Sequence, residues 1–499
     1  MVSCSGCWPE WLQSRLRRAA LVLLGLAACA AGAHAAAPAL APCWLDGVMH
    51  EARCGSIKRP LDPARPNGTT IDLHFAVLPA LARQPAPDPV FFIAGGPGQS
   101  AVDLAGPVSR MLARLGRTRD IVLVDQRGTG RSAPLQCDDA ADTPGWREQF
   151  DARLQIKRLR DCLARLQALP YGDLRHFGTS VAMADLDAVR QALGAAQINL
   201  VAASYGTRAA LEYLRLFPQQ VRRAVLDGVV PADMALAEAA AVDTQAAFDA
   251  LLRWCSEDPR CRRDHPHLAQ RWQALHASLP RELRIADVVS GRSEPLRLTS
   301  DALERLVRTG LYLPSTASAL PAAIDAAAQD RFEPLVALTA ALSGAPGRAM
   351  LAQGMHFAVV CSEDRPRDGR PRAPPSPMGG GLAELYREVC AFWPRGEPPA
   401  GFGASSAAGS PVLLLSGGID PATPPRHGER VARALGGNAR HEVVAQAGHG
   451  LLALPCITEA VNRFIAAADD AAALGVEFGC ARELPRPPLF VPPGSTAAP

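Results

Sequence analysis

Short apolar runs that end at glycine or at a polar residue recur through the first half of the chain. Runs of this kind are typical of strands that are buried on both faces of a parallel sheet. Residues 70–77 differ, because apolar and polar side chains partly alternate there, which favours an early antiparallel strand. The buried strands are expected to end near Ala94, Val124, Ala203 and Leu226.

The segments between these runs, and most of the chain after them, have apolar residues at helical spacing. Residues 180–193 and the segment that follows residue 204 through Leu216 have this spacing, and residues 233–407 are rich in alanine, leucine and arginine with the same period. Strands that alternate with helices predict an α/β fold, with a mostly parallel sheet flanked by helices and interrupted by an inserted helical cap. Within the cap, helices are expected near 235–255, 300–311 and 317–342.

The apolar run that ends at Ala203 leads into Ser204, Tyr205 and Gly206. Small neighbours suit a nucleophile elbow, a strained strand-to-helix turn that exposes a serine hydroxyl. The usual pattern is G-x-S-x-G, and Ala202 stands in place of the first glycine. Ser204 is therefore the candidate nucleophile, although a similar pattern also occurs at ordinary strand-to-helix turns.

Two later segments supply an acid and a histidine, in the chain order of an α/β-hydrolase. Asp420 follows the strand-like run at 411–417, and His449 lies between two glycines after a short run at 441–445. The carboxyl ends of parallel strands meet at one edge of a sheet. We therefore predict a catalytic triad in which His449 takes the proton of Ser204 and Asp420 orients the imidazole.

Asp227 is a rival for the role of the acid. It also follows a short apolar run, at 224–226, and would lie at the end of the preceding strand. The alternative role for this side chain is to cap a loop.

The glycine-rich loop at 95–100 suits an oxyanion hole, because glycine lets the backbone approach a substrate closely. The backbone amides of Gly96 and Tyr205 are the predicted donors. No G-K-[ST] follows the loop, so a Walker-type phosphate site is excluded.

Three motifs stand out in the first half of the chain, namely G-G-P-G at 95–98, D-Q-R-G-x-G-x-S at 125–132 and S-Y-G-T at 204–207. Together they resemble the motifs of the proline iminopeptidase family of serine peptidases, and a D-P-x-T-P turn at 420–424 resembles that of its tripeptidyl aminopeptidase-like branch. The resemblance implies hydrolysis of a peptide bond near a free amino terminus, with release of one residue or a short peptide and without a cofactor. It spans roughly residues 70–232 and 408–480.

An aminopeptidase needs an anion that holds the substrate ammonium group. Glu363 and Asp364, next to Cys361, are the candidates for this role. Thr423 is a candidate for orienting Asp420 through a hydrogen bond, with a turn-forming role as the alternative. The carboxylates that compete for the ammonium site are Glu238, Asp243 and Asp249.

Composition excludes some classes of function. The formal net charge is only +3, from 52 basic and 49 acidic residues, so a nucleic-acid partner is not expected. No close cluster of cysteine and histidine predicts a metal site. The expected partner is a peptide or a small acyl substrate.

The amino terminus has the pattern of an export signal, since Arg17 and Arg18 precede an apolar stretch of signal-peptide length. Cleavage after Ala35 would give a soluble periplasmic or secreted protein. The alternative is a lipobox that would leave a lipid anchor at Cys29 on the cell envelope. No later apolar run is long enough to span a membrane.

Ten of the thirteen cysteines follow the leader, and an even number in an exported protein suggests disulfides. Their spacing pairs neighbours along the chain. The predicted bonds are Cys43–Cys54, Cys137–Cys162, Cys255–Cys261, Cys361–Cys390 and Cys456–Cys480.

The sequence thus predicts an exported serine hydrolase, with an aminopeptidase as the leading interpretation. An esterase acting on small acyl substrates is the alternative within the same chemistry, and a non-catalytic binding protein is the alternative outside it. The predicted segments are a signal peptide at 1–35, the hydrolase core at 36–232 and 408–484, the cap at 233–407, and a proline-rich tail at 485–499.

Overall fold

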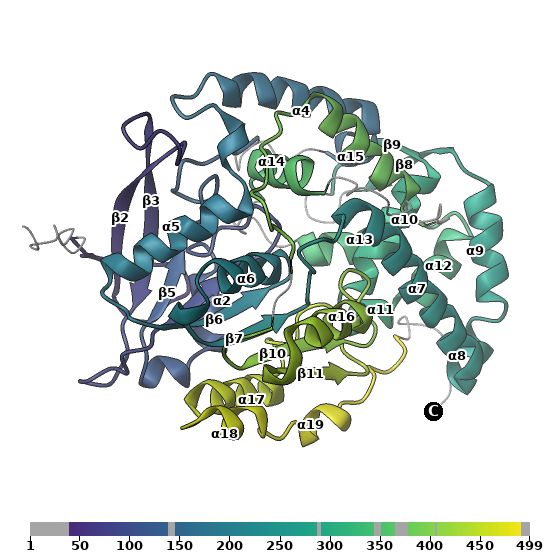
Figure 1. Cartoon of the computed structure of the whole chain (residues 1–499). Helices are drawn as coiled ribbons and strands as arrows, with labels where there is room; N and C mark the ends of the chain where they lie inside the picture. The colour runs from purple at the N-terminus through teal and green to yellow at the C-terminus, as the bar shows by residue number, and fades with distance from the viewer. Residues whose placement is uncertain are drawn as a thin grey trace, which may run out of the picture. The chain divides into compact units, whose positions relative to one another are not determined.

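A computed structural model describes most of the chain after the predicted leader (Figure 1). The leader and Cys29 lie outside the described residues, as does the end of the proline-rich tail. The described residues all belong to one compact unit. The described residues are 39–137, 145–286, 291–343, 351–364, 378–404 and 407–490.

A nine-stranded sheet in this part of the chain has the order β1-β2-β3-β5-β4-β6-β7-β10-β11. The strands run parallel from β5 to β11, and β1 to β3 are antiparallel. β3 confirms the early antiparallel strand. The strands are β1 (Ala41–Cys43), β2 (Ala52–Pro60), β3 (Thr70–Leu78), β4 (Val90–Ile93), β5 (Ile121–Val124), β6 (Ile198–Ala203), β7 (Val221–Asp227), β10 (Val412–Gly417) and β11 (Ala439–Val444).

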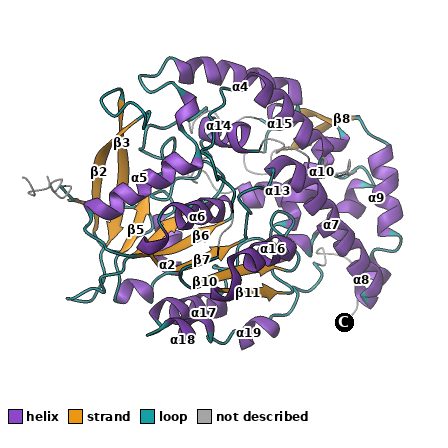
Figure 2. Cartoon of the chain, viewed as in Figure 1, coloured by secondary structure: helices purple, strands orange, loops and turns teal. Residues whose placement is uncertain are grey.

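Helices cover both faces of the sheet (Figure 2). Phe91 and Leu200 on one face pack with α5, α6 and α16, whereas Phe92 and Val201 pack on the other face with α2 and α17. Burial on both faces explains why the central strands are continuous apolar runs. The helices are α2 (Ala105–Met111), α5 (Thr179–Ala192), α6 (Tyr205–Leu216), α16 (Pro425–Leu435) and α17 (Pro455–Ala466), with α18 (Asp470–Leu474) and α19 (Gly479–Arg482) after α17.

The segment between β7 and β10 is mainly helical and has its own apolar core. It also contains a hairpin of β8 (Arg281–Ala286) and β9 (Ser293–Leu298), which the helical spacing did not predict. The helices are α7 (Leu236–Glu257), α8 (Pro259–Asp264), α9 (Leu268–Ala277), α10 (Ser300–Leu311), α11 (Pro314–Ala317), α12 (Leu320–Ala327), α13 (Glu333–Ser343), α14 (Gln353–Glu363) and α15 (Gly380–Phe392).

The single helix expected at 317–342 is wrong, because the structure divides this stretch. Asp330 has a left-handed backbone, with φ 64°, and the amide of Arg331 donates to the carbonyl of Ala326 at 3.0 Å. This is the Schellman arrangement that ends a helix. The sequence did not indicate this helix end, because aspartate rather than the usual glycine occupies the left-handed position.

Two helices from the first half of the chain pack against the insert. Trp146 and Phe150 of α3 (Trp146–Phe150) lie in the same apolar cluster as Phe248 of α7. α4 (Ala152–Gln167) packs with α14 and α15. The helical layer beside the sheet is therefore built from two separate segments of the chain.

Short 3-10 turns occur at Leu115–Arg117, Leu174–His176, Pro218–Gln220 and Gly436–Asn438.

The described residues contain five disulfides, at the pairs predicted from the sequence spacing. They join β1 to β2, the loop before α3 to α4, α7 to α8, α14 to α15, and α17 to α19. Each restricts the unfolded chain and typically adds about 2–4 kcal/mol of stability.

No helix among the described residues is long and apolar enough to cross a bilayer.

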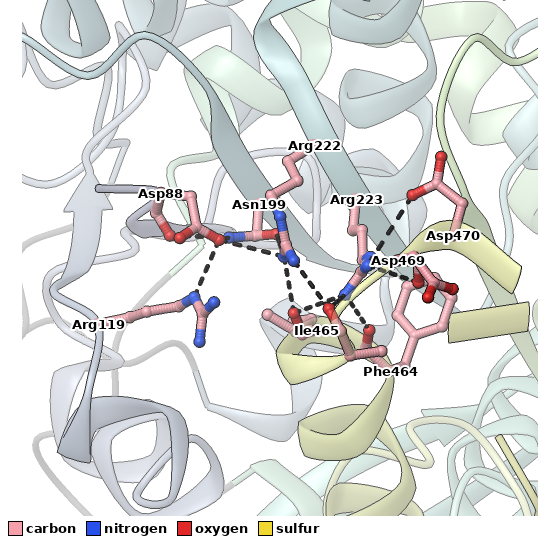
Figure 3. Close-up of polar contacts among 10 residues, drawn as sticks. Asp88, Arg119, Asn199, Arg222, Arg223, Phe464, Ile465, Asp469 and Asp470 are labelled. Carbon is pink, nitrogen blue, oxygen red and sulfur yellow. Dashed lines mark hydrogen bonds and ion pairs between the residues drawn. The ribbon is translucent and has the colours of Figure 1, made fainter. Parts of the chain in front are cut away.

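Arg223 of β7 fastens the end of α17 to the sheet (Figure 3). Its buried guanidinium donates to carbonyl oxygens of Phe464, Ile465, Ala467 and Asp469 at 2.7–2.9 Å. The last carbonyls of a helix lack intrahelical donors, so this arginine acts as a cap. α17 begins shortly after His449. The Arg223 contacts therefore fix the carboxyl end of the helix that follows the histidine loop.

Candidate active site

Ser204 lies at the turn between β6 and α6 with a backbone that is rare for a residue other than glycine. Its φ is 55° and its ψ is −126°. A Cβ at Gly206 would lie 2.4 Å from the carbonyl oxygen of Ile93, so only glycine fits there. The turn is thus strained and closely packed against β4, as a nucleophile elbow requires.

Hydrogen bonds hold the elbow on both sides. The amide of Ser204 donates to the carbonyl of Asp227 at 2.8 Å. The Thr207 hydroxyl donates to the carbonyl of Ser204 at 2.6 Å and accepts from the amide of Val230 at 2.8 Å. These bonds tie the turn to the end of β7, the neighbouring strand.

His449 and Asp420 are hydrogen-bonded to each other. The Nδ1 atom of His449 lies 2.8 Å from Oδ2 of Asp420. Burial alone would raise the pKa of Asp420, but His449 and Thr423 outweigh it and lower the pKa to about 2. Burial lowers the pKa of His449, and the charge of Asp420 outweighs it, so that pKa is raised above its ordinary value. An ionised carboxylate that orients an imidazole is the arrangement a serine nucleophile needs.

Thr423 lies beside this pair. Its hydroxyl donates to Oδ2 of Asp420 at 2.6 Å and is 3.1 Å from Nδ1 of His449. The amides of Ala422 and Thr423 donate to the other carboxylate oxygen at 2.7 and 2.9 Å. The Asp420 carboxylate is therefore fixed in one orientation. The predicted acid-orienting role of Thr423 is consistent with these contacts.

Asp227 makes different contacts from Asp420. Its carboxylate accepts hydrogen bonds from the amides of Leu451 and Leu452, both at 2.9 Å. Burial raises its pKa, partly offset by these two amides. It therefore caps the loop that follows His449, whereas Asp420 is the carboxylate bonded to the imidazole.

The turn after β7 lies next to both ends of the candidate triad. The carbonyl of Asp227 accepts from the amide of Ser204, and a Cβ at Gly228 would lie 3.1 Å from Cε1 of His449. Ser204 and His449 thus border the same two-residue turn at the carboxyl edge of the sheet. Ligands of open α/β sheets bind at this edge.

The glycine-rich loop after β4 lies against Ser204. A Cβ at Gly95 would lie 3.1 Å from Cβ of Ser204, and Gly96 has a φ of 109°. Tyr205 is the first residue of α6, so its amide has no acceptor within the helix. Gly96 and Tyr205 are therefore in the neighbourhood that an oxyanion hole requires.

α14 of the insert holds the far side of this loop. The amide of Ala352 donates to the carbonyl of Gly98 at 2.9 Å. Nδ1 of His356 lies 3.0 Å from the carbonyl oxygen of Pro97, and Nε2 lies 2.7 Å from the Tyr386 hydroxyl. Because a carbonyl only accepts, Nδ1 carries the proton and Tyr386 donates to Nε2. Burial lowers the pKa of His356 to about 4, which keeps this ring neutral.

Glu363 and Asp364 both face Arg208, a fully buried residue of α6. The Glu363 carboxylate accepts from the amide and hydroxyl of Thr179, at 2.7 and 2.9 Å. Asp364 accepts from Arg208 at 2.9 Å and from the amide of Leu236 at 2.6 Å. Burial raises the pKa of Glu363 to about 7, despite the nearby arginine. These contacts account for both carboxylates without a substrate, so an ammonium site there stays a prediction.

Tyr312 is a neighbour of the triad that sequence reasoning missed. Its carbonyl accepts from the amide of His449 at 2.8 Å, and its ring packs edge-on against the imidazole with centroids 5.2 Å apart. It follows α10 in the insert, far from His449 along the chain. No local pattern could have indicated this contact, which exists only because the insert folds over the sheet edge.

A family profile of the α/β hydrolase fold matches residues 88–454. The chain belongs to the α/β-hydrolase family. This hydrolase is 27% identical over 454 residues to the serine protease Hip1 of Mycobacterium tuberculosis, covering 83% of this chain and 85% of that protein. It is 33% identical over 220 residues to a tripeptidyl aminopeptidase of Streptomyces lividans, 40% of each chain.

The hydrolase is 28% identical over 432 residues to carboxylesterase B of Mycobacterium tuberculosis, covering 78% of this chain and 79% of that one. Among solved structures, a proline iminopeptidase from Mycobacterium smegmatis matches 85% of this chain and 100% of its own, with 16% identity and a TM-score of 0.38.

Proposed function

We propose that this α/β-hydrolase is a serine peptidase that works through an acyl-enzyme on Ser204. In this mechanism His449 takes the serine proton and later donates it to the leaving amine, while Asp420 stabilises the charged imidazole. The amides of Gly96 and Tyr205 stabilise the oxyanion. The observation that carries the proposal is the hydrogen-bonded pair of His449 and Asp420 at the sheet edge where the strained Ser204 turn lies.

The proposed reaction is aminopeptidase cleavage, with release of one residue or a short peptide. The motif resemblance and the similarity to a tripeptidyl aminopeptidase support it. The insert supports it as well, because Tyr312 contacts His449 and α14 holds the loop at Pro97, so the insert borders both sides of the site. Such a cover favours chain ends over internal bonds.

The test uses chromogenic peptide amides of one to four residues, each with a free or an acetylated amino terminus. We expect wild type to cleave the free-amino substrates and to lose turnover on acetylation, while Ser204→Ala is inactive on all of them. The best substrate length then distinguishes release of a single residue from release of a tripeptide. Cleavage of acetylated and free substrates at equal rates would contradict an aminopeptidase.

Esterase activity is the second candidate, since the same triad hydrolyses both bonds and the similarity to a carboxylesterase covers most of the chain. Hydrolysis of simple esters through Ser204, with no cleavage of any peptide amide, would favour it. Failure of an active-serine probe to label Ser204 would instead favour a non-catalytic binding protein.

Export is also part of the proposal. The basic and apolar leader and five disulfides in the following chain support it, because disulfides persist in oxidising compartments. The intact mass of the mature protein tests it. A chain beginning after Ala35 indicates a soluble product, and a lipid-modified Cys29 indicates an envelope anchor.

A further inference from the structure

Arg308 is a cation on the insert that has no carboxylate partner in the described part of the chain. It lies on α10 and is half-buried, and its Nε atom donates to the buried hydroxyl of Thr244 at 3.1 Å. Its two terminal nitrogens make no hydrogen bond or ion pair to any residue that the structure describes. The Thr244 contact therefore holds the side chain in place, while the four N–H donors on the terminal nitrogens remain available.

Arg308 lies next to the candidate triad. Its guanidinium is 5.2 Å from the ring centroid of Tyr312, and the same ring packs against His449. Its charge opposes protonation of His449 and also acts on the Tyr386 hydroxyl. Tyr386 is linked through His356 to the glycine-rich loop. The cation is thus within electrostatic reach of both flanks of the site.

The position of this charge is unfavourable for the free enzyme. The half-buried guanidinium gives up part of its hydration without gaining a carboxylate among the described residues, which costs free energy. A positive charge near His449 also opposes the imidazolium that forms during acylation. A carboxylate bound to Arg308 would offset both costs. It would also give Arg308 the planar, two-pronged partner that its geometry favours.

The direction of the reaction indicates which part of the substrate carries that carboxylate. His449 returns its proton to the leaving amine, so the leaving group lies on the histidine side of Ser204. Arg308 contacts Tyr312, which contacts His449, and so it borders this side. A cation there would repel a substrate ammonium group, which belongs to the acyl part.

We propose that Arg308 binds a carboxylate on the leaving-group side of the substrate, and so favours short peptides with an acidic group just beyond the cleaved bond. This inference rests on the proposed peptidase function and specifies its substrate class. The carboxylate has two sources, the free carboxyl terminus of a short peptide or an acidic side chain.

The experiment compares peptides that share one acyl part, the one that wild type releases best, and that carry a single leaving residue. The first ends in a free carboxylate, the second in a carboxamide, and the third in an aspartate carboxamide. The p-nitroanilide of the same acyl part reports on the proposed function alone. We expect wild type to prefer the first over the second by about tenfold in kcat/KM, which is typical of a charge-assisted hydrogen bond at a half-exposed site. A similar preference for the third would identify an acidic side chain as a second source.

Arg308→Met and Arg308→Lys separate charge from packing. The wild-type preference is expected to fall towards unity in Arg308→Met, which keeps the aliphatic length, and to persist in part in Arg308→Lys. A wild-type ratio near unity, or one that Arg308→Met leaves unchanged, would overturn the inference. If Arg308→Met does not fold, the wild-type and Arg308→Lys ratios decide. If the p-nitroanilide is not cleaved through Ser204, the proposed function fails instead.

Discussion

The Asp227 carboxylate accepts hydrogen bonds from the amides of Leu451 and Leu452, and so fixes the loop that follows His449. Its backbone carbonyl simultaneously accepts from the amide of Ser204. One residue at the end of β7 therefore sets the position of both the nucleophile turn and the histidine loop. A side chain that takes no part in the chemistry can in this way control the distance between the groups that do.

Asp227→Asn should weaken this link. The asparagine side chain has one oxygen, which can accept from one of the two backbone amides. Its NH2 group faces the other backbone N–H, so that buried hydrogen bond is lost. We expect the free energy of unfolding to fall by about 1–3 kcal/mol and the rate of Ser204 labelling to fall with it. Asp72→Asn, in an exposed pair with Lys58, is the control, with a change within about 0.5 kcal/mol. Equal effects of the two changes would contradict the anchoring role.

The pH dependence of activity should report the pair of His449 and Asp420. His449 acts as a base only when neutral, and its pKa is raised by Asp420. The acid limb of kcat/KM is therefore expected above 6.5, the ordinary pKa of histidine. Asp420→Asn removes the negative charge, which should move this limb to lower pH and reduce kcat on the order of 10³- to 10⁴-fold. An unmoved limb would argue that another group sets the profile.

The same carboxylate should also make stability depend on pH. Its pKa in the folded state is about 2, below the ordinary 3.8, so its stabilising contribution is present above 3.8 and is lost as the pH falls towards 2. Urea unfolding of wild type and Asp420→Asn between pH 5 and pH 2 measures this contribution. The difference between the two proteins should shrink as the pH falls, and a constant difference would contradict the lowered pKa.

Thr423 should matter for turnover through its hydroxyl. Thr423→Val keeps the shape but removes the hydrogen bond to Asp420, and we expect kcat to fall by about 10- to 100-fold, which is the range for a hydrogen bond to a charged group. Thr423→Ser keeps the hydroxyl and should retain most of the activity. If serine and valine are equally poor, the methyl group and not the hydroxyl is what the site needs.

Gly417 at the end of β10 lies against the loop that carries His449, and so also sets the position of this loop. A Cβ there would lie 2.0 Å from the carbonyl oxygen of Gly448, the residue before His449. Gly417→Ala should displace this loop, with a loss of about 1–3 kcal/mol in stability and a large loss of activity. Gly437→Ala, where no atom lies within 4 Å of the new methyl group, is the matched control. Full activity of Gly417→Ala would show that the loop tolerates displacement.

Local sequence was sufficient for much of the fold and for the candidate residues of the site. Continuous apolar runs indicated the parallel strands, because strands buried on both faces must be apolar throughout. Small residues around Ser204 indicated the strained turn, since only they fit beside β4. The five disulfides follow neighbouring cysteines along the chain, so their pairing also depended on short separations.

The tertiary structure decided how those residues are connected in space. Asp227 and Asp420 look alike in sequence, as each follows an apolar run, and only the fold shows which of them reaches the imidazole. Glu363 resembled a substrate-binding acid, yet α6 places Arg208 against it. Tyr312 packs against His449 and Arg308 lies over the ring of Tyr312, and both residues belong to an insert that is distant in sequence from the histidine loop. Spacing along a chain predicts local backbone and burial, whereas contacts between distant segments depend on how those segments pack.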